Sequence, residues 1–192
     1  VKRFSKKPID AFKKVIAPHG EKVLVHASNF RKVKRVQDVI KIFAGVRKAM
    51  PAKLLMIGDG PERSPMEVLA KELGVQDDVR FVGKQEQIEE ILLVSDLFLL
   101  TSDYESFGLA ALEAMASHVP VISSNTGGIP EVNTHGVSGY LSDVGDVDDM
   151  AKNALRILKD ELTLNKFKEQ AYQQALKFDI HNILPMYEQL YD

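Results

Sequence analysis

One stretch of the sequence decides the fold: Leu97-Phe98-Leu99-Leu100-Thr101-Ser102-Asp103-Tyr104-Glu105-Ser106-Phe107-Gly108-Leu109-Ala110-Ala111-Leu112-Glu113-Ala114-Met115. An apolar run of strand length comes first, a polar loop follows, and a helical pattern rich in small residues starts near Phe107. In open α/β sheets, ligands lie where a strand's carboxyl end meets the next helix, because free backbone N–H groups and the helix dipole point there. We therefore expect an anion to bind at this junction.

Two carboxylates flank the expected anion site. Glu105 lies in the loop, and Glu113 is expected roughly two turns inside the helix. A carboxylate repels a phosphate, so each must face another group, and an ionised carboxylate can accept hydrogen bonds from two hydroxyls. Sugar hydroxyls are the natural partners. A phosphate and a sugar together predict a nucleotide sugar as the ligand.

The rest of the chain repeats this alternation of strand and helix. Apolar runs of strand length occur at residues 22–27, 52–57, 79–82, 97–100, 119–123 and 136–141, with helical patterns between them. The alternation predicts an α/β fold, a Rossmann-like, doubly wound parallel sheet with strand order 3-2-1-4-5-6.

Local signals mark several helix ends and loops. Ser64-Pro65-Met66-Glu67 predicts a capping box with proline at the first helical position, and Gly74 is expected to end that helix. Asp146 is expected to cap a helix that runs to about Lys159. The pair Gly127-Gly128 predicts a tight loop that shapes the floor of the ligand pocket.

Composition excludes several classes of protein. The chain has 192 residues, 45% of them hydrophobic, and a net charge of −2, which indicates one globular domain. No apolar run approaches the ~20 residues that span a bilayer, and no leader pattern is present. The absence of cysteine fits a reducing compartment, so we expect a cytoplasmic protein. Basic clusters without interleaved aromatics argue against nucleic acid, and scattered histidines argue against a metal site.

The loop after the second strand, Gly58-Asp59-Gly60-Pro61-Glu62-Arg63, resembles the start of a dinucleotide fingerprint. The third glycine position holds Arg63, and the loop follows the second strand rather than the first, so the sequence argues against an NAD site. Gly58 is expected instead to give a nucleotide-sugar donor close access to the backbone.

Three features together resemble the donor-binding half of the retaining GT-B glycosyltransferases of group 1. They are Glu105 and Glu113 with seven residues between them, Ser106-Phe107-Gly108-Leu109, and Asn125-Thr126-Gly127-Gly128-Ile129-Pro130-Glu131. The resemblance covers nearly all of residues 22–160. It implies the C-terminal domain of a GT-B fold, which binds its donor without a metal ion or another cofactor.

The resemblance also implies a cationic partner for the donor's pyrophosphate. One lysine of the first loop has this role in the family, and Lys34 matches it by position. An arginine often lies five residues earlier, where this chain has Asn29. Either Arg31 or Arg35 compensates for the lost charge, or an amide suffices.

The remaining roles follow from the same resemblance. The N–H groups of residues 107–109 are expected to stabilise the leaving diphosphate with Lys34, Glu113 to accept the ribose hydroxyls, and Glu105 to hold the transferred sugar. The segment after Gly83 lines the nucleobase in similar enzymes. The candidate catalytic residues are Glu105 and Lys34, and the candidate donor-binding residues are Asn29, Arg31, Lys34, Gly58, Lys84, Gln85, Glu105, Ser106, Phe107, Gly108, Leu109 and Glu113.

Residues 28–39 and 58–63 most resemble the branch of the family that joins N-acetylglucosamine to L-malate in bacillithiol synthesis. This implies UDP-N-acetylglucosamine as donor and L-malate as acceptor. Two alternatives stay open. One is a group 1 enzyme with another nucleotide-sugar donor and a glycan or lipid acceptor, and the other is a non-catalytic module that binds nucleotide sugars.

The domain organisation is expected to follow the family. Residues 1–21 would form an interdomain connection with one short helix, 22–160 the donor-binding domain, and 161–192 helices that cross back to an N-terminal acceptor domain. Because that domain is absent from the sequence, the isolated chain is expected to be inactive. An apolar stripe that includes Ile183, Leu184 and Tyr187 is either exposed or packed on a second copy, which leaves a homo-oligomer open.

Overall fold

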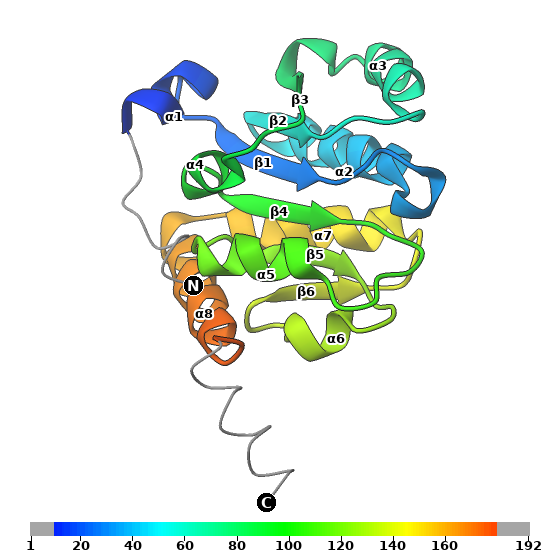
Figure 1. Ribbon diagram of the computed structural model, residues 1–192. Coiled ribbons are helices and arrows are strands. Elements are labelled where there is room, and N and C mark those ends of the chain that lie inside the picture. The colour runs from blue at the N-terminus through cyan, green and yellow to red at the C-terminus, as the bar shows by residue number, and fades with distance from the viewer. Residues whose placement is uncertain (1–9, 180–192) are drawn as a thin grey trace, which may run out of the picture.

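A six-stranded parallel sheet forms the centre of the molecule in the computed structural model, which describes residues 10–179 (Figure 1). The strand order β3-β2-β1-β4-β5-β6 confirms the predicted topology, and every pairing is parallel. The strands are β1 (Lys22–Ala27), β2 (Ala52–Ile57), β3 (Val79–Gly83), β4 (Leu97–Leu100), β5 (Val121–Ser124) and β6 (Gly139–Ser142).

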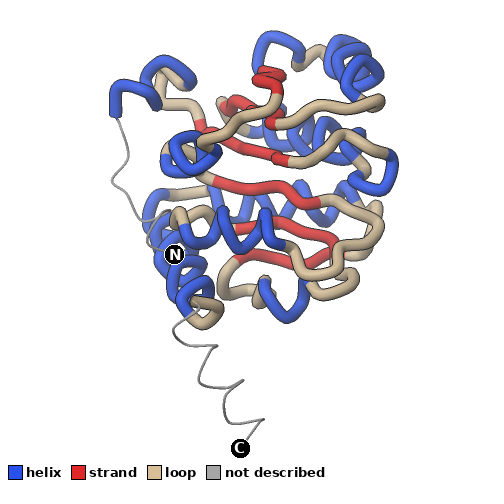
Figure 2. Tube along the Cα trace, in the orientation of Figure 1, coloured by secondary structure: helices blue, strands red, loops and turns tan. Residues whose placement is uncertain are grey.

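Helices cover both faces of this sheet, so the predicted Rossmann-like, doubly wound fold is confirmed (Figure 2). In Figure 1, α5 lies in front of the sheet and α7 behind it. The helices are α1 (Asp10–Ile16), α2 (Val36–Ala49), α3 (Arg63–Glu72), α4 (Ile88–Leu93), α5 (Leu109–Ala116), α6 (Ile129–Val132), α7 (Val147–Leu158) and α8 (Glu161–Leu176), with 3₁₀ turns η2 (Lys32–Lys34) and η3 (Gln76–Asp78).

The central strands are mostly apolar because both faces of the sheet are buried there, and β4 is apolar and buried throughout. Leu24 packs in the core under α2, α3 and α7, whereas Val23 and Val25 pack in the second core under α4 and α5. Helix α8 contributes to both cores, with Leu164 in the first and Ala171 in the second. Successive strand residues therefore stabilise opposite layers of the same domain.

Two local predictions about helix ends are confirmed. The side chain of Asp146 accepts a hydrogen bond from the Asp149 N–H and caps α7, which ends at Leu158. Gly74 adopts a left-handed backbone with φ +69° directly after Leu73, the C-cap residue of α3. Both positions use local chemistry that requires little tertiary context.

Two other predictions about helix starts are wrong. The capping box at Ser64 does not form, because α3 already begins at Arg63, where the Glu62 carbonyl accepts from Met66 and the Glu62 N–H donates to Phe30. Helix α5 begins at Leu109 rather than near Phe107, because Gly108 has a left-handed φ of +81° that no α-helix contains. Glu113 therefore lies about one turn inside α5, not two.

The flanking segments are described in part. The short helix expected before residue 22 is α1, and the first amphipathic pattern after residue 160 is α8. The apolar stripe with Ile183, Leu184 and Tyr187 lies outside the described residues. Among residues 10–179, no helix has the length and apolar character needed to cross a membrane.

A buried carboxylate joins three elements at the end of the sheet where the strands begin. Asp96, just before β4, is almost fully buried and accepts hydrogen bonds from the Val23 N–H, from Lys13 Nζ at 3.1 Å and from Lys168 Nζ at 2.7 Å. Burial alone would raise the pKa of Asp96, but the charges of Lys168 and Lys13, together with the hydrogen bonds from Lys168 and the Val23 N–H, hold the pKa below its usual value. Asp96 thus links α1, β1 and α8.

Replacement of Asp96 should reveal this link. Asp96→Asn is expected to lower the free energy of unfolding by about 2 kcal/mol, a value discounted because both lysines are partly exposed. Since the folded pKa lies below the unfolded value near 3.8, the contribution is present above pH 3.8 and is lost as the pH falls through the folded pKa. Urea unfolding at several pH values measures both effects.

The control is Asp77→Asn, which changes an exposed carboxylate in η3 and should leave stability nearly unchanged. A difference between wild type and Asp96→Asn that grows on acidification would contradict the assigned role of the charge.

Candidate functional site

A lysine and a glutamate meet where the order of the sheet reverses, between β1 and β4. The Lys34 Nζ lies 2.7 Å from the Glu105 Oε2, and the Ser102 hydroxyl donates to the same oxygen at 3.2 Å. Both charged side chains keep about a fifth of their surface exposed. The two candidate catalytic residues are therefore in direct contact at the topological switch point, where open α/β sheets bind ligands.

Backbone contacts hold the two loops of this site together. The Asp103 N–H donates to the Val33 carbonyl at 2.8 Å, and the buried Thr101 hydroxyl lies 2.9 Å from the Lys34 carbonyl and 3.1 Å from that of Arg35. In Figure 1, the strand arrows of β1 and β4 point to the same side of the molecule, where these loops emerge. The backbone on either side of Lys34 is thus attached to the loop of Glu105.

Arg35, directly after Lys34, is engaged by two protein carboxylates. Its Nε lies 2.6 Å from the Asp38 Oδ2 and its Nη1 lies 3.1 Å from the Asp103 Oδ1. The hydrogen bond that Arg35 donates to Asp38 is the main cause of a raised pKa for Arg35. Of the two arginines considered for the charge missing at Asn29, Arg35 therefore faces protein, and Arg31 is exposed.

Three predicted donor-binding residues line one hollow of about 480 Å³. Asn29 and Arg31 come from the loop after β1, and Lys84 follows β3; Asp59, Gly60 and Pro61 complete the lining. Gln85 is exposed, and its side-chain amide donates to the Val82 carbonyl at 2.7 Å. The structure thus gathers residues from three loops at the carboxyl ends of β1, β2 and β3.

Gly58 has a reason to be glycine within the protein itself. Its φ is +121°, and a Cβ there would lie 1.8 Å from the Ser28 carbonyl oxygen. The loop after β1 packs directly on the loop after β2 at this position. Access of a donor to the Gly58 backbone remains a prediction.

The amino terminus of α5 presents its first backbone N–H groups without a side-chain cap within the described residues. Ser106, Phe107 and Leu109 are exposed there, and the Phe107 ring makes an edge contact with Phe178 at 6.0 Å. Glu113 is partly buried on the same helix. N–H groups at a helix start attract anions, and binding of a diphosphate by the N–H groups of residues 107–109 stays a prediction.

The two glycines after β5, Gly127 and Gly128, pack against the backbone of the Glu105 loop. The Gly128 N–H donates to the Glu105 carbonyl at 3.0 Å, and the Thr126 hydroxyl donates to the Asp103 carbonyl at 3.0 Å. A Cβ on Gly127 would lie 2.0 Å from the Glu105 carbonyl oxygen. The pair therefore lies against the backbone of the site, as a pocket floor would.

His26 is a buried residue beside this site. Its Nδ1 lies 2.9 Å from the Leu99 carbonyl and its Nε2 lies 2.8 Å from the Ser28 hydroxyl. Burial lowers its pKa to about 4, and the charge of Lys34 acts in the same direction. Because a carbonyl only accepts, Nδ1 carries the proton, so His26 is a neutral support for the loop after β1 near pH 7.

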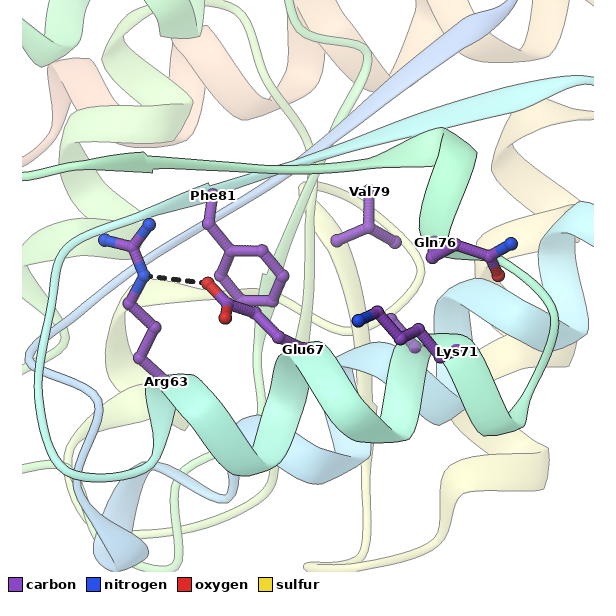
Figure 3. A pocket seen from close by; sticks show the side chains of 7 residues that line it. Arg63, Glu67, Lys71, Gln76, Val79 and Phe81 are labelled. Carbon is purple, nitrogen blue, oxygen red and sulfur yellow. Dashed lines mark hydrogen bonds and ion pairs between the residues drawn. The ribbon is translucent and has the colours of Figure 1, made fainter.

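A second hollow of about 330 Å³ lies between α3 and β3 (Figure 3). Arg63 donates to Glu67 at 3.0 Å and its guanidinium lies 5.8 Å from the centre of the Phe81 ring. The predicted donor-binding residues do not line this hollow, and Arg63 is already engaged by Glu67 and Phe81. In the described part of the chain, no group of three or more histidine or acidic side chains could hold a metal ion.

Sequence reasoning missed four residues that shape the site. Arg35 was considered only as a phosphate ligand, but it joins the loop after β1 to the loop after β4 through Asp103. Ser102 donates a hydrogen bond to Glu105, and His26 supports the loop after β1 through Ser28. The positions of Asp103 and Ser102 just before Glu105 were the only available signal. Their partners lie far away in sequence, so spacing could not identify them.

Residues 9–174 match the model of the family described as glycosyl transferases group 1. The chain belongs to this family. The recognition of a group 1 glycosyltransferase from the residues around Glu105 is thus confirmed.

Two curated relatives illustrate the range of this glycosyltransferase family. N-acetyl-alpha-D-glucosaminyl L-malate synthase from Bacillus anthracis is 49% identical over 173 residues, which cover 90% of this chain and 45% of that protein. The 2-deoxystreptamine N-acetyl-D-glucosaminyltransferase from Niallia circulans is 33% identical over 157 residues, which cover 78% of this chain and 40% of that protein. The chain thus spans less than half the length of these relatives.

Solved structures of glycosyltransferases share the fold. Anabaena HepE, determined in complex with UDP-glucose, matches 99% of this chain and 54% of its own with a TM-score of 0.88 and 24% identity. Sucrose-phosphate synthase from Thermosynechococcus elongatus matches 98% of this chain and 49% of its own with a TM-score of 0.85 and 26% identity. The solved neighbours are GT-B glycosyltransferases, which confirms the predicted fold class.

The packing of Gly127 against the Glu105 loop can be tested by a matched pair of substitutions. Gly127→Ala places a Cβ against the Glu105 carbonyl, whereas Gly136→Ala at φ +75° meets no atom within 4 Å. Gly136→Ala should cost about 1 kcal/mol of stability for its left-handed backbone. Gly127→Ala should cost at least about 1–2 kcal/mol more, because the loop must also move. Chemical denaturation measures both, and equal losses would contradict the tight packing.

Proposed function

We propose that this chain is the donor-binding half of a retaining glycosyltransferase that transfers N-acetylglucosamine from UDP-N-acetylglucosamine to L-malate. The observation that carries the proposal is the contact between Lys34 and Glu105 at the switch point of the sheet. A cation suits the phosphate of a sugar–phosphate bond, and a carboxylate beside it suits the hydroxyls of the sugar. The 49% identity to the N-acetylglucosaminyl malate synthase of Bacillus anthracis supports this choice of substrates.

Lys34 would bind the diphosphate, where negative charge grows as the sugar leaves. Its ammonium has three N–H donors, so contact with Glu105 leaves donors for phosphate oxygens. Such charge-assisted contacts contribute roughly 1.5–3 kcal/mol each. The N–H groups of Phe107, Gly108 and Leu109 would add to the same stabilisation. Since these groups supply the positive field, we propose that no metal ion is required.

Glu105 would orient the transferred sugar rather than attack it. Its Oε2 is engaged by Lys34 and Ser102, and both bonds reduce the nucleophilicity of that oxygen. A carboxylate held in this way is suited to accept hydroxyls of the hexose, while Glu113 on α5 would accept those of the ribose. The configuration would then be retained because the acceptor hydroxyl attacks on the same face of the sugar that the phosphate leaves. The leaving phosphate would take the proton of that hydroxyl.

The donor sugar is better supported than the acceptor. The names of both relatives include N-acetylglucosaminyl transfer, but one acts on malate and the other on 2-deoxystreptamine. Because the chain spans less than half of each relative, the acceptor site would lie largely on a further domain that partners this one. Residues 22–160 would then be the donor-binding domain, with residues 1–21 and 161–192 as its connections to that partner.

Calorimetric titration with UDP tests the site. The chain should bind UDP, and Lys34→Ala or Glu113→Ala should each weaken binding about tenfold or more, the factor that corresponds to ~1.4 kcal/mol. Lys32→Ala is the matched control, because Lys32 is an exposed lysine in the same loop and should not change the affinity.

Two arms of the same titration refine this test. Unchanged binding by Lys34→Ala and Glu113→Ala would show that neither residue belongs to the UDP site. Loss of binding in EDTA would show that the site needs a metal ion. UDP should also bind more tightly than GDP or ADP, and the reverse would favour another donor.

The chain alone should form no product from UDP-N-acetylglucosamine and L-malate. The acceptor must be held against the anomeric carbon, and we assign that task to the further domain. Mass spectrometry of the reaction mixture provides the measurement. Measurable N-acetylglucosaminyl malate would show that this chain holds the acceptor by itself.

A further inference from the structure

Arg35 stands out because its backbone conformation is unfavourable for its side chain. Among the described residues, Arg35 and His118 are the only residues other than glycine with a positive φ, at +47° and +59°. Glycine adopts this region without strain. An arginine retained there needs compensating contacts in the surrounding structure.

Those contacts join the two loops of the site. Asp38, which is buried on α2, receives the Arg35 Nε at 2.6 Å, and Asp103, which lies two residues before Glu105, receives Nη1 at 3.1 Å. Gly145 lies on the other side of the guanidinium, where a Cβ would be only 2.9 Å from Nη2. The side chain therefore fills a space between α2, the loop after β4 and the loop after β6.

The Arg35–Asp103 pair runs beside the Lys34–Glu105 pair. Each pair joins the loop after β1 to the loop after β4. Lys34 and Arg35 are adjacent in sequence, and Asp103 lies two residues before Glu105. The proposed donor would contact Lys34 and Glu105 themselves. The Arg35 pair uses no atom assigned to the donor, so it can persist when the donor is bound.

We propose that Arg35, through Asp103, is a positioning residue that keeps Lys34 directed at the donor diphosphate. This inference rests on the proposed function and extends it to a residue that does not touch the ligand. Arg35 adds a side-chain link to the backbone contacts between the two loops, and Lys34 is thereby ordered before the diphosphate arrives.

A double-mutant cycle in UDP affinity tests the proposal. Arg35→Gly removes the guanidinium and fits the left-handed backbone, so the fold should persist, as circular dichroism and urea unfolding can verify. We expect this variant to bind UDP about fivefold more weakly than wild type. In the Lys34→Ala background, Arg35→Gly should change the affinity by less than about twofold, because its effect passes through Lys34.

Two further variants sharpen the cycle. Asp103→Ala removes the partner on the second loop at a half-exposed position and should reproduce the fivefold loss, again only when Lys34 is present. His118→Gly is the matched control, because it relieves the same backbone region between α5 and β5, away from the site, and should leave UDP affinity unchanged.

The outcomes separate this inference from the proposed function. Failure of the wild-type chain to bind UDP would overturn the proposed function. Binding by wild type that Lys34→Ala weakens and Arg35→Gly does not would overturn the role of Arg35 alone. An equal loss on Arg35→Gly with and without Lys34 would also overturn it, because the arginine would then act by another route.

Discussion

The contact between Lys34 and Glu105 depends on the order of the strands. The two residues are 71 positions apart in sequence and meet because β1 and β4 are neighbours in the sheet. Between them, β2 and β3 cross the sheet in the same direction as β1, and α2, α3 and α4 each return the chain toward the edge where the strands begin. The parallel pairing of β1 with β4 is thus the constraint that creates the site, and the buried apolar strands stabilise it.

The site is held in place before any ligand binds. Thr101, Asp103 and Gly128 fix the backbone around Lys34 and Glu105 through hydrogen bonds of 2.8–3.1 Å. His26 is neutral beneath the same loop, so it adds no charge that would compete for Glu105. Ordered charges in a partly water-excluded position stabilise developing charge more than mobile ones, because little reorganisation remains when reaction begins.

The fold was predictable because its signals are local, whereas much of the site was not. Apolar runs such as Val23–Val25 indicate strands buried on both faces, and Asp146 caps α7 with a residue three positions away. The capping box at Ser64 failed because a tertiary bond from Glu62 to Phe30 moved the helix start. The Arg35–Asp103 pair spans 68 positions, and no spacing rule reaches so far.

The Lys34–Glu105 pair also couples the two parts of the proposed donor. In the unliganded protein, Glu105 neutralises part of the charge that Lys34 offers to a phosphate. Lys34 still offers its remaining N–H donors to a nucleotide without its sugar, and under the proposed roles the hydroxyls of a sugar would add hydrogen bonds to Glu105 that weaken its hold on Lys34. Under the roles proposed here, the carboxylate makes the field at the diphosphate depend on the presence of the sugar, so the stabilisation of the leaving group is greatest when the complete donor is bound.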